Sequence, residues 1–308
     1  MLGIINVILP VFGLLGLGYF GGTFRFLGPQ VGEGLSAFVF IYCLPALIFR
    51  TIATAVFPEA QPWGYWLSYF IAVALCWAAA MFIASRTFRA NRAESVVFGF
   101  AAGQSNTVFV GIPLILKAYG DAAVVPLFLL LAIHLPVTMT SATLMMEGRE
   151  RLSFASLFSP LLRNPVLQGL IAGLLWRLTG FEYGGPLKTI VDYVADASIP
   201  CALIATGLAL HRYGIRGEFK LVSVIASLKL LAHPALVWLF AFKIFSMPPV
   251  WSGVAVLFAA MPTGVNSYLF AERYKAGVPV VSSTIALSTG LSFFSTMFWL
   301  WALHIGQG

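Results

Sequence analysis

The chain has 308 residues, of which 60% are hydrophobic and only 9% are charged. Soluble domains carry about 25% charged residues, so this composition excludes a soluble protein and indicates one that crosses a membrane many times. The net charge of +7 would suit nucleic acid, but the basic residues are spread over short loops between apolar runs, which argues against a nucleic-acid-binding patch.

Ten apolar stretches are long enough to cross a bilayer, which needs about 20 residues of helix. They cover roughly residues 3–22, 34–54, 64–84, 94–119, 122–146, 160–180, 187–210, 219–243, 250–274 and 278–304. The sequence therefore predicts an all-α polytopic membrane protein. The first stretch is expected to be a retained helix, because no basic segment of a cleaved signal precedes it.

The fourth and ninth stretches are interrupted by polar residues and by glycine or proline. The interruptions run from Gly103 to Pro113 and from Ala260 to Tyr268. Backbone that leaves the helix at membrane depth persists only where protein buries it or where it lines a watery cavity. A matched pair of such breaks is the sequence signature of a transporter binding site.

The breaks hold the side chains that we expect to bind a substrate. The binding candidates are Asn106, Asn266, Gln104, Ser105, Thr107, Thr263 and Ser267, and the expected helix breakers are Pro113, Pro262, Gly111 and Gly264. Half-helix N-termini at the breaks would carry partial positive charge and attract a carboxylate. These polar side chains could instead only satisfy the unwound backbone, and the sequence leaves both roles open.

Ionisable residues are scarce in the apolar stretches. The candidates for attracting an anion or coupling to protons are Lys229, His233, Asp196 and Glu272. Lys229 and His233 share one helix face, since they are four residues apart. Alternatively, Lys229 snorkels or pairs with Asp192 or Asp196, and His233 caps a carbonyl near Pro234. His134 is expected to have a structural role.

Catalytic and metal-binding motifs are absent from the sequence. There is no Ser/His/Asp set, no metal-spaced cluster of histidine and cysteine, and no phosphate-binding glycine loop, so neither an enzyme nor a resident cofactor is expected. Neither break contains a carboxylate, which weakens an ion-antiporter interpretation. A Na⁺ site built from hydroxyl, amide and carbonyl oxygen remains open, so H⁺ and Na⁺ are both retained as coupling ions.

The two halves of the chain repeat weakly. Leu44-Pro45-Ala46-Leu47 in the second stretch matches Ile199-Pro200-Cys201-Ala202-Leu203 in the seventh. Five spans per half would insert the second half upside down, which predicts inverted repeats over residues 1–155 and 156–308. Twelve Lys and Arg residues fall on one side and five on the other. The positive-inside rule then places both termini on the outer side.

At these residues the chain resembles the auxin efflux carrier family in its compact bacterial form. The resemblance rests on Leu44–Leu47, Asn106–Leu114, Asn164-Pro165, Asp196–Leu210 and Met261–Tyr274. It implies a fold like that of bile-acid sodium symporters and sodium-proton antiporters, with helices 4 and 9 crossing. It also implies a scaffold of spans 1, 2, 6 and 7 and a transport domain of spans 3–5 and 8–10. The long loop of the plant proteins is reduced here to about Glu147–Ser159.

The breaks and the resemblance together predict a secondary transporter of small organic anions, such as malonate- or auxin-like carboxylates. It would work by alternating access in the inner (plasma) membrane. Na⁺- or H⁺-coupled symport on the same scaffold is the first alternative, and a membrane ligand sensor or a channel is the alternative of another class. The expected partners are the substrate anion and membrane lipid, without nucleic acid, and a homodimer is compatible with the exposed apolar area.

Overall fold

The computed structural model describes residues 2–55, 63–148, 164–212 and 218–305, and its regular secondary structure in these ranges is helical apart from one isolated β-bridge. The α-helices are α1 (Leu2–Thr23), α2 (Pro29–Phe38), α3 (Leu44–Thr54), α4 (Trp63–Thr87), α5 (Arg92–Gly103), α6 (Ile112–Tyr119), α7 (Val124–Glu147), α9 (Pro165–Thr179), α10 (Gly185–Asp196), α11 (Ser198–Arg212), α12 (Phe219–Ser227), α13 (His233–Trp238), α14 (Pro249–Ala260), α15 (Val265–Tyr274) and α16 (Val278–Ala302). They are joined in places by the π-helical turns η1 (Val39–Cys43), η2 (Thr107–Gly111), η5 (Leu228–Ala232) and η6 (Leu239–Ile244) and the 3₁₀ turn η3 (Gly120–Ala123). The predicted boundary between the repeats, at residues 155 and 156, lies outside the described ranges.

Seven helical runs within the described residues are long and apolar enough to cross a membrane, which supports an integral membrane protein. They are Gly3–Thr23, Pro29–Thr54, Trp63–Thr87, Thr107–Glu147, Gly185–His211, Phe219–Ile244 and Val278–Ala302. The fourth run joins the second part of the predicted stretch 94–119, which contains α6, to the predicted stretch 122–146, which is α7, through η3. The remaining predicted spans involve shorter or interrupted helices, namely α5, α9 and the pair α14–α15. The total of ten spans therefore stays a prediction.

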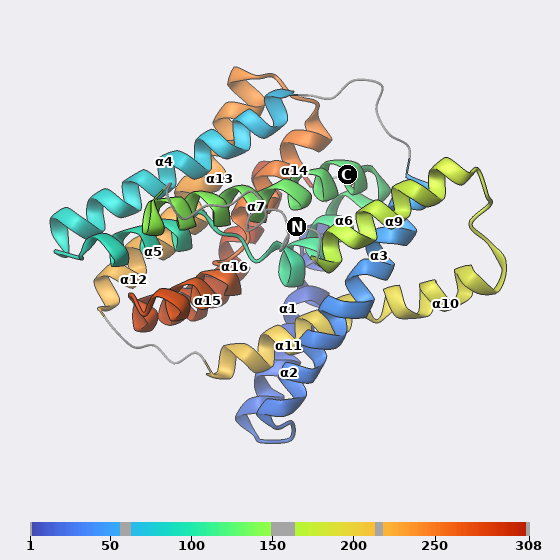
Figure 1. Ribbon diagram of the computed structural model, residues 1–308, viewed down its shortest axis with the longest axis horizontal. Helices are drawn as coiled ribbons and strands as arrows, with labels where there is room; N and C mark the ends of the chain where they lie inside the picture. The colour runs from blue at the N-terminus through green and yellow to red at the C-terminus, as the bar shows by residue number, and fades with distance from the viewer. Residues whose placement is uncertain (1, 56–62, 149–163, 213–217, 306–308) are drawn as a thin grey trace.

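The helices pack in two groups, which occupy different regions of Figure 1. In the first group, α1 packs on α11, α11 on α2, and α3 on both α9 and α10. In the second group, α4 packs on α5, α13 on α14, and α16 on α12, α14 and α15. Fewer contacts join the groups, among them those of α1 with α6 and α16 and those of η2 with α11. A boundary of relatively sparse packing thus runs through the molecule.

Small residues bring α1 and α11 into close contact. A Cβ atom on Gly207 would lie 2.0 Å from the Leu15 carbonyl oxygen, and one on Gly18 would lie 2.2 Å from the Ile204 carbonyl oxygen. Both distances are far below van der Waals contact, so side chains larger than hydrogen cannot fit there. The glycine-rich start of the chain therefore serves helix packing at Gly18.

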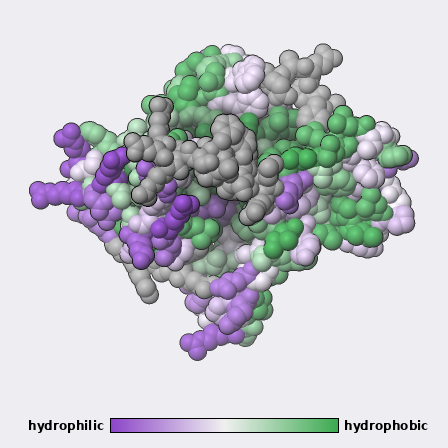
Figure 2. Space-filling model, viewed as in Figure 1, coloured by the Kyte–Doolittle hydropathy of each residue, from purple (hydrophilic) through white to green (hydrophobic). Residues whose placement is uncertain are grey.

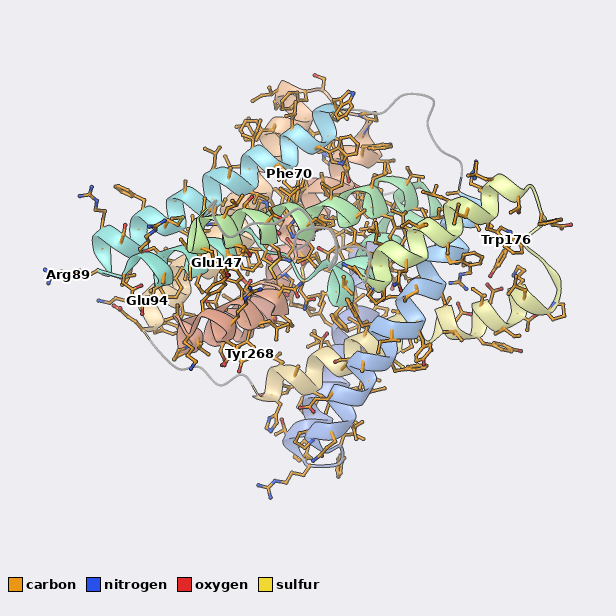
Figure 3. The ribbon with its side chains drawn as sticks, viewed as in Figure 1. Phe70, Arg89, Glu94, Glu147, Trp176 and Tyr268 are labelled. Carbon is orange, nitrogen blue, oxygen red and sulfur yellow. The ribbon has the colours of Figure 1, made fainter. Side chains whose placement is uncertain are left out.

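The surface is apolar over much of its area, as lipid contact requires. Large exposed side chains include Leu178, Phe181 and Phe26, with 83%, 72% and 81% of their area accessible. Figure 2 shows hydrophilic residues gathered toward the left and lower ends of the molecule, with hydrophobic residues over the right and upper parts. Arg89 and Trp176 lie at opposite ends in Figure 3.

Candidate functional site

The two breaks predicted from sequence lie side by side and pair through their backbones. Ser105 and Thr263 form an antiparallel bridge. The N–H of Asn106 donates to the carbonyl of Pro262 at 2.8 Å, and the N–H of Gly264 donates to the carbonyl of Gln104 at 3.0 Å. Each non-helical segment therefore supplies hydrogen-bond partners for backbone N–H and C=O groups of the other. This pairing allows two helix breaks to persist at membrane depth.

Four helix ends meet at this crossing. α5 ends at Gly103 and α14 ends at Ala260, while η2 begins at Thr107 and α15 begins at Val265. The first N–H groups of a helix have no partner within it and form the positive end of its dipole. Both of these N-terminal ends line one cavity. The crossing thus directs two positive helix ends toward the same space.

The cavity has a volume of about 810 Å³ and lies between the two groups of helices. Ser36 of α2 and Thr206 of α11 line it from the first group, and residues of the crossing, α7 and α16 line it from the second. At one end it reaches the exposed residues Arg25 and His211. Such a volume falls in the range of about 300–1,000 Å³ that is typical of small-molecule sites.

Five of the seven predicted binding residues line this cavity. They are Gln104, Ser105, Asn106, Thr107 and Asn266. Asn106 is 5% exposed, and within the described part of the chain no hydrogen bond engages its side chain or that of Asn266. The Thr107 hydroxyl is also buried without a partner among the described residues. Polar groups without a partner beside a cavity are available to a ligand.

The other two predicted binding residues are buried but do not line the cavity. The Thr263 hydroxyl donates to the Ala101 carbonyl at 3.2 Å, and its N–H donates to Ser288 Oγ at 3.1 Å. Ser267 is fully buried in α15. Thr263 therefore serves to close the end of α5, whose last carbonyls have no partner within the helix.

Two of the four predicted helix breakers lie in the non-helical backbone of a break, and the other two lie in the helical turns that follow the first break. Pro262 and Gly264 lie in the second break, and a Cβ on Gly264 would come within 3.0 Å of the Ser105 carbonyl oxygen. In the fourth stretch the backbone is non-helical at Gln104–Asn106, and Pro113 lies in the first turn of α6, after the π-helical turn η2. Proline is tolerated in a first turn because its missing N–H is not needed there. Gly111 ends η2 and packs against Met261.

The predicted coupling residues are not brought together. Lys229 and His233 are fully buried against α14 and α4 and do not line the cavity. Glu272 is exposed near the end of α15. Asp196 is 2.7 Å from Arg50, which rules out the alternative pairing of Asp196 with Lys229.

Arg50 forms the centre of a separate ionic cluster within the first group of helices. Asp192 lies 3.4 Å from Arg50, and it also contacts Lys188 and the Tyr183 hydroxyl. Burial and the neighbouring carboxylate of Asp192 raise the pKa of Tyr183 to about 12, so its hydroxyl remains protonated and donates to Asp192 at 3.1 Å. This cluster joins α3 to α10 and does not contribute to the cavity.

Three residues of α4 and α7 support the site without having been predicted to do so. The Thr138 hydroxyl donates to Gln104 Oε1 at 2.9 Å, which fixes the Gln104 side chain. His134 lines the cavity, and its Nδ1 lies 3.2 Å from the Tyr69 hydroxyl. The sequence does show that these three polar residues lie within apolar stretches, which is a signal for a buried role. It does not show that α4 and α7 pack beside the breaks.

Similarity to known proteins covers the whole chain. The sequence profile of the "Membrane transport protein" family matches residues 3–155 and 151–300. A Rhizobium meliloti (strain 1021) protein named "Putative malonate transporter" is 30% identical over 99% of this chain and 98% of its own length. An "Uncharacterized transporter" of Methanothermobacter thermautotrophicus is 24% identical over 97% of this chain and 98% of its own length.

A plant relative is similar over part of the chain. The "Probable auxin efflux carrier component 9" of Oryza sativa subsp. japonica is 28% identical over 43% of this chain and 32% of its own length. The profile match and the full-length similarity agree with the interrupted helices and the apolar surface described above. The chain belongs to the membrane transport protein family that includes the auxin efflux carriers, and it is a transporter and not an enzyme.

Proposed function

We propose that this protein is a secondary transporter of small organic carboxylates, which it binds in the cavity at the crossing. The observation that carries the proposal is that two helix N-termini and the side chains of Asn106 and Asn266 line one cavity. Helix N-termini bind anions through free N–H groups and the helix dipole. The asparagine amides would add donors that hold a carboxylate in a defined orientation.

The charges around the cavity favour an anion over a cation. Arg25 and His211 stand at its mouth, and Glu33 of α2 is the acidic residue among the described residues that line it. No carboxylate lies in either break. The two helix N-termini that line the cavity would therefore stabilise an anion there, and neither break supplies a carboxylate that would compete with it.

Malonate-like dicarboxylates are the first substrates to test. The relative named for malonate is similar to this chain from end to end, but its substrate comes to this protein only as a proposal. A cavity of about 810 Å³ also has room for larger acids such as indole-acetate, so volume alone does not select among carboxylates.

The two groups of helices support an alternating-access mechanism. The first group would be the scaffold of spans 1, 2, 6 and 7, and the second would be the transport domain of spans 3–5 and 8–10, within inverted repeats 1–155 and 156–308. Sparse packing between the groups would allow them to move relative to each other. The cavity reaches the Arg25 end, which the positive-inside rule places in the cytoplasm. The structure would then correspond to an inward-facing state.

The test is uptake of labelled malonate, succinate and indole-acetate into proteoliposomes. The wild type would be compared with an Asn106→Ala/Asn266→Ala double variant and with Asn6→Ala, an exposed asparagine of α1 that does not line the cavity. We expect saturable uptake that the double variant loses and the control retains. Equal uptake by all three would refute the site.

A ligand sensor is the second candidate function, because a cavity that binds a carboxylate could serve a sensor equally well. Substrate-dependent thermal stabilisation without any flux would favour the sensor. Imposing Na⁺, pH and voltage gradients separately in the same vesicles would identify the driving gradient and so decide between uniport and Na⁺- or H⁺-coupled symport.

A further inference from the structure

A lysine is buried directly behind the crossing. Lys229 lies in η5, is fully inaccessible to solvent and does not line the cavity. The ion pairs of the described residues engage Arg50, Lys188 and Arg273, and none includes Lys229. An ammonium at membrane depth is costly, so such a residue is retained only where it meets a defined partner.

The partner of Lys229 is the free end of a broken helix. Its Nζ donates a hydrogen bond to the carbonyl of Ala259 and lies 3.3 Å from His233 Nδ1. Ala259 is in the last turn of α14, which ends at the crossing. The last carbonyls of a helix have no partner within it and form the negative end of its dipole. Transporters with broken helices place coordinated cations at such ends.

The two helices that end at the crossing are closed differently. The Ala101 carbonyl of α5 accepts a hydrogen bond from the hydroxyl of Thr263 at 3.2 Å, whereas the Ala259 carbonyl of α14 accepts one from the side-chain nitrogen of a lysine, Lys229. The charged group is therefore not a general requirement for closing a broken helix. It supplies a positive charge at one particular end.

Buried side chains connect this positive charge to the cavity wall. The ring of His233 packs on Tyr69 with centroids 5.3 Å apart, and Phe258 of α14 packs on both Tyr69 and His134. The Tyr69 hydroxyl is 3.2 Å from His134 Nδ1, and His134 lines the cavity. Lys229 thus belongs to the same packed unit as the substrate site.

We propose that the Lys229 ammonium is a resident cation that takes the place of an exchangeable metal ion at the end of α14. By neutralising the negative end of α14, it lets an anion bind at the crossing without a co-transported Na⁺. Lys229 acts as a positioning residue, because it touches the broken helix and not the substrate. The inference rests on the proposed function for its effect on carboxylate binding, although the cation site itself can be tested without a substrate.

The test measures malonate affinity and thermal stability of the purified protein in NaCl and in choline chloride at equal ionic strength. Three variants are compared: Lys229→Met, Lys229→Arg and, as a matched control, Lys243→Met, which removes an exposed lysine near the end of the same helical run. Lys229→Met removes the cost of burying a charge but leaves the Ala259 carbonyl without its donor, so the thermal midpoint of each variant is measured first and affinities are compared for folded protein only.

We expect wild-type affinity to be the same in both salts. Lys229→Met should weaken binding by about tenfold, since a charge at a partly buried helix end has an effect of this order. Lys229→Arg should restore most of the affinity in choline chloride, and Lys243→Met should leave it unchanged. A role in packing alone would not produce this pattern, because methionine fills the space of lysine without its charge.

Two results of the affinity measurement would overturn the proposal. One is malonate affinity that requires Na⁺ in the wild type, and the other is unchanged affinity in Lys229→Met. The thermal arm needs no substrate: a wild-type midpoint that rises in NaCl but not in choline chloride would reveal an exchangeable metal site and would also overturn it. If no carboxylate binds in any salt, the proposed function fails. The comparison of wild-type unfolding midpoints in NaCl and choline chloride still tests whether a metal ion binds at the end of α14.

Discussion

Trp299 shows how a single side chain can compensate for a proline inside a membrane helix. Pro234 has no N–H, so the carbonyl of Leu230 four residues earlier loses its usual helical donor. The indole Nε1–H of Trp299 donates to that carbonyl at 3.1 Å, and Trp299 is 6% exposed. A distant helix therefore supplies the hydrogen bond that the backbone cannot make.

Replacement of Trp299 by Phe should destabilise the protein by about 1–3 kcal/mol, since a buried carbonyl would be left unpaired. In a Pro234→Ala background the restored N–H can bond Leu230, so the same replacement should cost less. Thermal unfolding in detergent would measure both effects, with Trp63→Phe as an exposed control. An equal loss with and without Pro234→Ala would show that lost packing, and not the hydrogen bond, is responsible.

The residues of the crossing were predictable from sequence because glycine, proline and asparagine within apolar stretches have few structural explanations. Gln104, Asn106 and Asn266 were identified in this way and line the cavity. The part played by His134 was not, since its pairing with Tyr69 depends on a contact across 65 residues of chain. The partner of Lys229 was missed because it is a backbone carbonyl. Every residue carries such a group, so residue types in the sequence do not indicate which one is the partner.

Three π-helical turns each end two residues before a proline. η1, η2 and η5 are followed by Pro45, Pro113 and Pro234, each at the second position of the next helix. Each proline removes a backbone donor, and the wider turn accommodates the local change in hydrogen bonding. Pro113 thus accompanies a widened turn, whereas the non-helical backbone at Gln104–Asn106 has partners across the crossing.

Close packing of α1 on α11 depends on glycine at particular positions. Gly207→Ala should cost about 1–3 kcal/mol, because the new Cβ would overlap the Leu15 carbonyl, which is backbone and cannot rotate away. Gly13→Ala in α1 meets no atom within 4 Å and should gain up to about 1 kcal/mol from helix propensity. Apparent melting temperatures of the two variants should therefore move in opposite directions. Similar shifts for both would mean that α1 and α11 do not pack as described.

At the scale of the whole molecule, composition and hydropathy were sufficient to predict an all-helical membrane protein but not to count its spans. Seven runs within the described residues meet the length and hydropathy expected of a span. The other predicted spans contain the breaks or are short, as α9 is with its 15 residues. Local hydropathy cannot decide these cases, because an interrupted helix spans a membrane only with the support of its neighbours.

Alternating access makes a prediction about which side of the membrane can reach the cavity. Ala209 of α11 lines it, so Ala209→Cys in a Cys201→Ser background should react with an impermeant thiol reagent from one side at a time. Without substrate, this should be the side that labels Arg89→Cys, predicted to be cytoplasmic, and not the side that labels Glu182→Cys. Saturating malonate should reduce the labelling rate, because it occupies the cavity or shifts the protein to the opposite state. Equal labelling from both sides, unaffected by substrate, would instead indicate a continuous pore, since a cavity that closes on one side before it opens on the other cannot admit the reagent from both.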